Sequence, residues 1–312
     1  MEQTAAVGAQ MVEDILLKSV VTFLLVALVL PAIEVRADRS SFWRYAGGKP
    51  EFVGGGVCAL PRTEPVEFLQ RKGYDVLFAP RLQMCLCVAY SLTPSDVSNK
   101  VGRIGGFKRD DDLGEKATDP KLYAGTGYDR GHMAPSQDMQ YDIEVSRQSF
   151  WMGNITPQTP RLNRGDWKRL EGIIHRKVMP SPKGDVSARR VYVLTGPIFT
   201  KEVLQQFEKD IQAFDANGGQ GNRPLIKPRS FWKIFKYGAT VEAVIMDQTV
   251  PGDYSADEWG ARSVSVGEIA KVTGLSFFSG MAADLRDFYL GYCRPMYGGD
   301  RKKKEKTTEK EE

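Results

Sequence analysis

Histidine and cysteine are the scarcest functional residues in this chain of 312 amino acids. Only two histidines are present, His132 and His175, which excludes a zinc site built from three histidines and a His-Glu-x-x-His protease helix. The four cysteines include no Cys-x-x-Cys pair and are too few to staple a secreted mini-protein, so we expect mostly buried, reduced thiols. Cys85 and Cys87 alternate in the apolar run 84–90, and this spacing predicts that both lie on one face of a strand.

A strong charge of either sign is also missing. Lysine and arginine number 43 against 39 aspartates and glutamates, and 42% of the residues are hydrophobic. These values exclude a wholly disordered protein, a collagen-like chain and a polytopic membrane protein. The basic surplus lies between residues 100 and 190, where 17 basic residues stand against 12 acidic ones. A polyanionic partner for this region is one interpretation, and a solvated surface of mixed charge is the other.

Long apolar runs are few as well. Residues 20–33 carry no charge, but as a helix they would span about 21 Å, against roughly 30 Å of membrane hydrocarbon. Extended to residues 15–33, the run includes Lys18, whose ammonium group can reach the membrane interface. Four interpretations stay open for this segment: a membrane anchor, a secretory signal cut after residue 37, an organelle-targeting segment, or a buried core helix.

The composition divides the chain into three parts. Residues 1–42 are predicted to be a targeting or anchor segment with a polar connector, and residues 43–298 to be the folded domain. Residues 299–312 form a charged, apolar-free tail that we expect to be disordered. Within the domain, residues 217–228 are rich in glycine and proline and are predicted to form a surface loop.

Strand-like and helix-like patterns are mixed without a regular βαβ order, which predicts an α+β fold. Apolar runs of strand length occur at residues 84–92, 149–155, 191–194, 232–235 and 240–246. Helical spacing of apolar residues occurs at residues 166–178, 202–213 and 263–272.

The residues around His132 give the first chemical signal. In the segment 123–135, YAGTGYDRGHMAP, the glycines permit tight turns, so the sequence DRGH is expected on a bend or at a strand end. A lone histidine is more often structural than catalytic. Here Asp129 or a backbone carbonyl could fix the imidazole ring, and Arg130 adds a cation where negative charge would form.

A second segment offers oxygen ligands. Residues 150–158, FWMGNITPQ, are expected to run from a strand into a proline-containing turn, and a helix follows. Asn163 could cap this helix, or its amide oxygen could bind a hard cation such as Mg²⁺. Glu171 lies about 12 Å further along the helix axis, so it would hold a metal-bound water and not the ion itself.

These segments together resemble the DNA/RNA non-specific endonuclease family, the ββα-metal nucleases, in its endonuclease G branch. The resemblance is carried by DRGHMAP at 129–135, NITPQ at 154–158 and the spacing N-x₃-W-x₂-L-E at 163–171, and it covers roughly residues 43–293. It implies a ββα-metal nuclease fold, with a central, mostly antiparallel sheet flanked by helices.

The resemblance also implies catalytic roles. His132 would be the general base that takes a proton from the attacking water. Asn163 would be the single direct protein ligand of Mg²⁺ or Mn²⁺. Arg130 and Arg103 would stabilise charge on the phosphorane-like transition state.

Supporting roles follow in the same way. Glu171 and Asn154 would organise the metal waters and the surrounding loop, and Asp129 would be a structural partner within the bend. The candidates for binding nucleic-acid phosphates are Arg164, Lys168 and Arg169, and a solvated helix face is the equal alternative for each.

DNA and RNA are the implied substrates, because the chemistry needs only a phosphodiester and a water and makes no use of the ribose 2′-hydroxyl. The resemblance implies a DNA-degrading homodimer in the mitochondrion, with membrane anchoring through residues 15–33 and access to the nucleus after release. A secretory or other membrane compartment is the alternative.

Two other functions stay open: a non-catalytic nucleic-acid-binding protein on the same fold, and a phosphodiesterase for small substrates. The segment 136–138 and the loop 217–228 depart from the family pattern.

Overall fold

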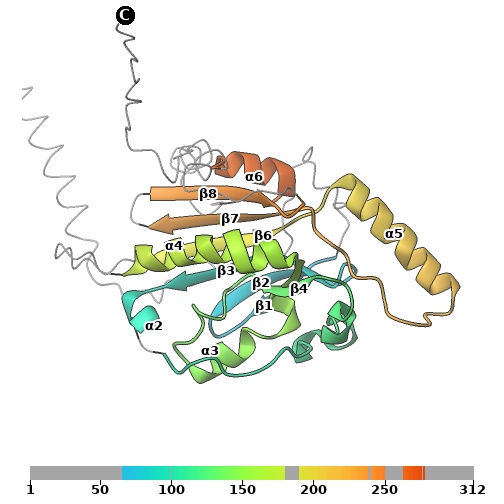
Figure 1. Ribbon diagram of the computed structural model, residues 1–312, viewed down its shortest axis with the longest axis horizontal. Helices are drawn as coiled ribbons and strands as arrows, with labels where there is room; N and C mark the ends of the chain where they lie inside the picture. Colours follow the sequence, from blue (N-terminus) through green and yellow to red (C-terminus); the bar gives the residue numbers. More distant parts are fainter. Residues whose placement is uncertain are drawn as a thin grey trace, which may run out of the picture. The chain divides into compact units, whose positions relative to one another are not determined.

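The computed structural model describes residues 65–98, 100–179, 190–237, 240–249, 263–275 and 277 (Figure 1). The chain divides into two units, Met1–Ser41 and Phe42–Glu312, and every described residue belongs to the second. The predicted anchor at residues 15–33 and the charged tail lie outside the described residues, as do Cys58 and Cys293. Within the described ranges, no helix is both long and apolar enough to cross a membrane.

A six-stranded sheet forms the centre of the described structure. In spatial order its strands are β1 Glu67–Gln70, β2 Tyr74–Ala79, β3 Met84–Leu92, β6 Val191–Ile198, β7 Ser230–Tyr237 and β8 Thr240–Asp247. All neighbouring strands pair antiparallel. The α+β class with a central antiparallel sheet is therefore confirmed.

Alternation along the strands creates two hydrophobic layers, one on each face of the sheet. On β7, Phe231 and Phe235 pack into the first layer, whereas Trp232 and Ile234 pack into the second. Successive side chains of a strand point to opposite faces, so a strand that is apolar throughout must be covered on both sides.

Helices cover both layers. The described helices are α2 Pro94–Ser98, α3 Ile143–Gln148, α4 Lys168–Val178, α5 Lys201–Ala216 and α6 Val266–Thr273, with the short helical segments η3 Asp111–Lys116, η4 Pro120–Tyr123, η5 Met152–Asn154 and η6 Leu162–Trp167. Helix α4 lies across the sheet in Figure 1 and buries Leu170, Ile174 and Val178 in the first layer. Helices α5 and α6 contribute to the second layer, α5 through Phe207 and α6 through Ile269.

Most of the predicted elements are confirmed. The predicted strands at 84–92, 191–194, 232–235 and 240–246 coincide with or fall within β3, β6, β7 and β8, and the predicted helices at 166–178, 202–213 and 263–272 overlap η6 with α4, α5 and α6. Residues 217–228 contain no helix or strand beyond the turn that ends α5, as expected for a loop.

The predicted strand at residues 149–155 is wrong. The chain leaves α3, forms the turn η5, and enters strand β5 (Ile155–Gln158) only at the last residue of that range. The run is apolar because Phe150 and Met152 are fully buried in the interior as parts of a loop and a turn. A buried loop needs apolar side chains just as a buried strand does, so residues 149–155 have the composition of a strand without forming one.

The prediction that Cys85 and Cys87 share a face is also wrong. The register of β2 and β3 shifts between Leu77 and Phe78, so Cys85 packs into the first layer and Cys87 into the second. A β-bulge adds one residue to a strand and so changes which face the following side chains occupy. Both thiols are buried and free, as expected, and burial raises the pKa of Cys85 to about 12.

Candidate active site

A small two-stranded sheet and the segment that leads into α4 position the candidate site. Strand β4 (Asp129–His132) pairs antiparallel with β5, and His132 lies opposite Ile155. The segment η6 that follows is a π-helix, whose wider turn carries Asn163 and Arg164. Single π-turns inside α-helices are rare and occur frequently at functional sites.

Asp129 joins the strand to this helical segment. Its carboxylate accepts hydrogen bonds from Asn163 Nδ2 at 2.9 Å, from Arg164 Nε at 2.8 Å and from Arg164 Nη2 at 2.6 Å. The hydrogen bonds from Arg164 and Asn163 lower the pKa of Asp129 and keep it ionised. Among the described residues, the hydrogen bonds of the Asp129 side chain go to Asn163 and Arg164 and none goes to the imidazole of His132.

The Asp129 contact determines which way the Asn163 amide points. An ionised carboxylate only accepts hydrogen bonds, so the amide nitrogen must face Asp129 and the amide oxygen is left over. The helical segment begins after Arg161 without a side-chain cap bond, so Asn163 does not act as the helix cap. The amide oxygen of Asn163 is thus used neither for the contact with Asp129 nor for capping the helix, so it can bind a ligand.

A pocket of about 460 Å³ opens at these residues. It is lined by Arg103, Phe107, Tyr123, Ala124, Tyr128, Asp129, Arg130, His132, Asn163 and Arg164. The lining therefore combines three arginines with one carboxylate and several aromatic rings. This excess of positive charge suits an anionic ligand such as a phosphodiester.

His132 packs against two aromatic rings at the pocket wall, and these two rings also contact each other. The centroid of its ring lies 5.0 Å from that of Phe150, edge to face, and 5.5 Å from that of Phe107. Nε2 of His132 is buried without a hydrogen-bond partner, whereas the side chain as a whole is only half-buried and lines the pocket. Nδ1 is therefore the ring nitrogen that can meet a water in the pocket.

The surroundings favour the neutral imidazole. Burial, together with the nearby guanidinium of Arg103, lowers the pKa of His132 from 6.5 to about 3. The aromatic rings provide no acceptor for an imidazolium proton, and a positive neighbour disfavours a second positive charge. His132 is thus unprotonated, the state that a general base requires, throughout the neutral pH range.

Each of the two predicted arginines lies over one of the rings that pack against His132. The guanidinium of Arg130 lies over the ring of Phe107 at 5.2 Å, and its Nε and Nη2 donate to the carbonyl of Pro120 at 3.2 and 2.9 Å. The guanidinium of Arg103 lies over the ring of Phe150 at 4.6 Å. The same two rings that pack against His132 therefore also orient the arginines.

Asn154 supports the loop that follows His132. Its amide oxygen accepts from the backbone N–H of Ala134 at 2.8 Å, and its Nδ2 donates to the carbonyls of Ala134 and Ser149, both at 2.9 Å. The side chain is fully buried and does not line the pocket. Its contacts fit the predicted loop support and leave no free amide atom for metal waters.

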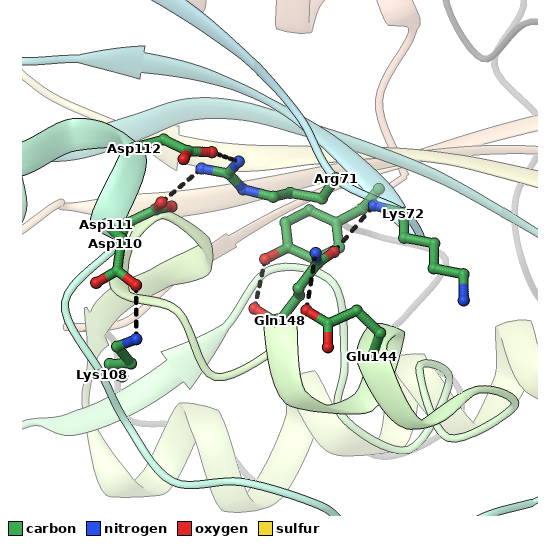
Figure 2. Close-up of polar contacts among 9 residues, drawn as sticks. Arg71, Lys72, Lys108, Asp110, Asp111, Asp112, Glu144 and Gln148 are labelled. Atoms are coloured by element: carbon green, nitrogen blue, oxygen red, sulfur yellow. Dashed lines mark hydrogen bonds and ion pairs between the residues drawn. The ribbon is translucent and has the colours of Figure 1, made fainter.

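A cluster of polar contacts fixes the pocket wall that carries Phe107. Arg71, in the turn between β1 and β2, is almost fully buried and donates to Asp110 at 2.5 Å and also to Asp112 (Figure 2). Gly153 passes so close that a Cβ atom there would lie 2.6 Å from Oδ2 of Asp110. These contacts anchor the segment after Phe107 from two sides.

Glu171 does not line the pocket. Its Oε1 lies 3.8 Å from Nζ of Lys233, whose fully buried side chain places the ammonium 4.3 Å from the centre of the Trp167 ring. Burial raises the pKa of Glu171, and Lys233 opposes that shift. The carboxylate of Glu171 therefore faces a lysine of the central sheet and lies outside the pocket lining.

The remaining histidine belongs to a separate contact. His175 lies on α4, and its Nδ1 is 3.0 Å from Oδ1 of Asp138. It is not among the residues that line the pocket.

The predicted phosphate-binding residues lie at and beside the pocket. The side chain of Arg164 is 72% exposed even though it pairs with Asp129. Lys168 and Arg169 are exposed at the start of α4, and Nη1 of Arg169 lies 3.4 Å from Asp166. Of the three, Arg164 alone lines the pocket.

The structure thus brings Arg103, Asp129, Arg130, His132, Asn163 and Arg164 together, and it leaves Asn154, Glu171, Lys168 and Arg169 outside the pocket lining. The residue types and motifs did not predict the aromatic part of the lining, which comprises Phe107, Tyr123 and Tyr128. Tyr128 lines the pocket, and its only sequence signal is its place beside the DRGH segment. Lys233 could have been noticed as a cation in the middle of the apolar run SFWKIFKY.

The donor set fits a hard divalent cation that has few protein ligands. Among the described residues, no group of three or more His, Cys, Asp and Glu side chains could hold a metal. The outward amide oxygen of Asn163, beside an ionised carboxylate, is the type of oxygen that Mg²⁺ and Mn²⁺ accept, with water and phosphate oxygens completing the shell.

Comparisons with known proteins agree with this fold. Over 215 residues the chain is 30% identical to a nuclease of Nostoc sp., a match that covers 64% of this chain and 68% of the relative. Over 172 residues it is 43% identical to the mitochondrial nuclease EXOG of Xenopus laevis, which covers 52% of this chain and 44% of that protein. A solved structure of the EndoG/EndoGI complex shares the fold, with a TM-score of 0.54 and 20% identity, over 69% of this chain and 86% of that chain.

A family model extends the match across most of the chain. Residues 60–284 match the model of the DNA/RNA non-specific endonucleases, a range that includes every described element. The chain therefore belongs to the DNA/RNA non-specific endonuclease family.

Proposed function

We propose that the chain is a divalent-metal-dependent, sugar-non-specific endonuclease that hydrolyses phosphodiester bonds of DNA and RNA. The observation that carries this proposal is the shared pocket of His132 and Asn163, a buried neutral imidazole and an amide whose oxygen is directed away from Asp129. The two groups have the chemistry of a base and of a ligand for a hard cation.

In this proposal His132 takes a proton from the attacking water through Nδ1, the nitrogen that can reach the pocket. Arg130 keeps Nη1 for the substrate, because its Nε and Nη2 are engaged by Pro120, and Arg103 adds a second positive charge. Both would lower the cost of negative charge on the phosphoryl oxygens in the transition state. A bound divalent ion would add charge neutralisation at the phosphate and at the leaving oxygen.

The remaining residues would support these steps. Asp129 orients Asn163 and Arg164, and Asn154 holds the loop after His132. We propose that Glu171 acts on water around the ion, since its place two turns further along the helix excludes direct contact together with Asn163. Lys168 and Arg169, together with Arg164, would bind neighbouring phosphates without reading sequence.

The test is divalent-dependent digestion of supercoiled plasmid, single-stranded DNA and RNA by the full chain. We expect Mg²⁺ or Mn²⁺ to support cleavage of all three, EDTA to abolish it, and added metal to restore it. Asn163→Ala should lower cleavage at a fixed Mg²⁺ concentration by at least about 100-fold, because even residues that only support a metal ligand contribute 10–100-fold.

A matched control is Asn217→Ala, an exposed asparagine at the end of α5, which should cleave as the parent does. Cleavage that persists in EDTA would contradict the metal requirement. Binding of nucleic acid without cleavage under every condition would favour the non-catalytic alternative, and faster hydrolysis of small diesters than of polymers would favour the small-substrate phosphodiesterase.

We also propose a mitochondrial location, anchoring through residues 15–33, nuclear access after release, and a homodimer. One matched relative is named as a mitochondrial nuclease, which supports the location, whereas another is a cyanobacterial nuclease. A fluorescent C-terminal fusion should colocalise with mitochondria, and removal of residues 1–37 should release it. A secretory pattern would contradict the location, and a monomeric mass in light scattering would contradict the dimer.

A further inference from the structure

The loop between α5 and β7 borders the candidate active site. Leu225 in this loop packs against the cluster of Tyr123, Met152 and Ile155. Tyr123 is itself part of the pocket lining. A segment that departs from the family pattern in sequence therefore forms part of the pocket surroundings.

The loop is held in place at several points. Arg223 donates to Oε1 of Gln83 at 3.2 Å and to the carbonyl of Arg81 at 2.9 Å. Ile226 is only 2% exposed, and the carbonyl of Pro228 accepts a hydrogen bond from Nε2 of Gln248 at 2.5 Å. The residue between these two, at position 227, is thus presented from a fixed backbone.

That residue is a lysine placed over a pocket residue. Nζ of Lys227 lies 5.4 Å from the centre of the Tyr128 ring, and Tyr128 lines the pocket. Lys227 is exposed although both its neighbours in sequence are buried. In the part of the chain that the structure describes, no carboxylate is paired with its ammonium group.

This arrangement places a fourth positive charge beside a pocket that already contains three arginines. The three arginines surround the place where one phosphodiester would react. A cation outside the base–metal pair meets the next phosphate of a continuous backbone, which a small diester does not have. Cation–π contact with Tyr128 limits the positions of the flexible lysine side chain.

We propose that Lys227, held over the ring of Tyr128, forms a subsite for a second backbone phosphate next to the one that is cleaved. The inference rests on the proposed endonuclease function and adds to it a residue that contacts the polynucleotide outside the phosphodiester that reacts. Lys227 contacts substrate, and Tyr128 positions it. One phosphate contact contributes about 0.9 to the slope of log affinity against log salt for duplex DNA, and about 0.7 for single strands.

The test compares Lys227→Ala with the full-length parent on a single-stranded oligonucleotide and on bis(4-nitrophenyl) phosphate, a single phosphodiester. We expect KM for the oligonucleotide to rise roughly threefold to tenfold, kcat to stay constant, and the salt slope to fall by about 0.7. Hydrolysis of the small diester should not change. Lys271→Ala, which removes an exposed lysine from α6, a helix outside the pocket lining, should match the parent.

Tyr128 variants separate positioning from packing. Tyr128→Phe keeps the ring and should keep the parental salt slope, whereas Tyr128→Ala should reproduce the lower slope of Lys227→Ala. An unchanged slope in Lys227→Ala, or an equal loss on the small diester, would overturn the subsite.

Oligonucleotide binding measured by anisotropy in EDTA gives the same slopes without any cleavage. The subsite can therefore be supported or overturned by this measurement even where the proposed activity fails, so the two failures are distinguishable.

Discussion

His132→Ala is expected to lower cleavage of DNA and RNA by about 10²- to 10⁴-fold, the range that a positioned general base contributes. The loss should fall on kcat, because the proposed role of His132 is to accept a proton in the reaction, and the arginines proposed to bind phosphate remain in place. Initial rates on plasmid and RNA at saturating Mg²⁺ measure it. Thermal melting of the same samples shows that the variant is folded.

The other histidine is the matched control for this change. His175 contacts Asp138, and neither residue lines the pocket, so His175→Ala should retain most of the activity. Parental cleavage by His132→Ala would show that the proposed base is wrong. An equal loss in both variants would show that histidine removal acts through the fold.

The pH profile of kcat/KM gives a further readout on the same imidazole. A general base no longer works once it is protonated. The fall of kcat/KM at low pH, the acid limb of the profile, is therefore centred at the pKa of that base in the free enzyme. Because burial and Arg103 lower the pKa of His132, the limb should lie at least one pH unit below the usual 6.5. Arg103→Gln removes the positive neighbour and should move the limb upward. A limb near 6.5 in the parent, or no movement in the variant, would contradict this account.

The second large effect is expected in stability. Lys233→Met should lower the free energy of unfolding by roughly 3–5 kcal/mol, because it leaves the carboxylate of Glu171 without its cation in a mostly buried place. Methionine fills a similar volume under Trp167, so little of the loss would come from a cavity. Urea denaturation followed by tryptophan fluorescence measures the change.

Two further variants test whether the effect is electrostatic. Lys233→Met leaves the charge of the Glu171 carboxylate unpaired. Adding Glu171→Leu removes that charge, so the double variant should regain most of the lost stability. Lys236→Met, on the same strand but only half-buried, should cost much less. A single Lys233→Met variant as stable as the parent would contradict the importance of the pair. The double variant should be inactive in cleavage despite its restored stability, since Glu171 is part of the proposed machinery.

Local patterns in the sequence were sufficient for the regular elements. The apolar stripe of Leu170, Ile174 and Val178 predicts the long part of α4, and the apolar run 84–92 predicts β3, because side-chain spacing reflects backbone geometry directly. The same rule failed at residues 149–155, where apolar residues serve a buried loop. It also failed at Cys85 and Cys87, where a bulge in the pairing of two strands changed the faces.

The candidate site divides in the same way. Residue types and spacing singled out His132 and Asn163, since few side chains can act as a base or as a neutral oxygen ligand. Which group orients each of them could not be read from spacing. Asp129 or a backbone carbonyl was a candidate to orient the imidazole, and the structure shows Asp129 hydrogen-bonded to the Asn163 amide, which lies 34 positions away in the chain.

By itself, the sequence determined the fold class and the family and predicted the identities of the reactive groups, because these depend on composition and on local order. The tertiary structure alone decided that His132 packs against Phe107 and Phe150, that Glu171 faces a buried lysine, and that Lys227 borders the pocket. These relations join residues far apart in the chain, and only the packing of the folded protein sets the distances and burial on which their electrostatics depend.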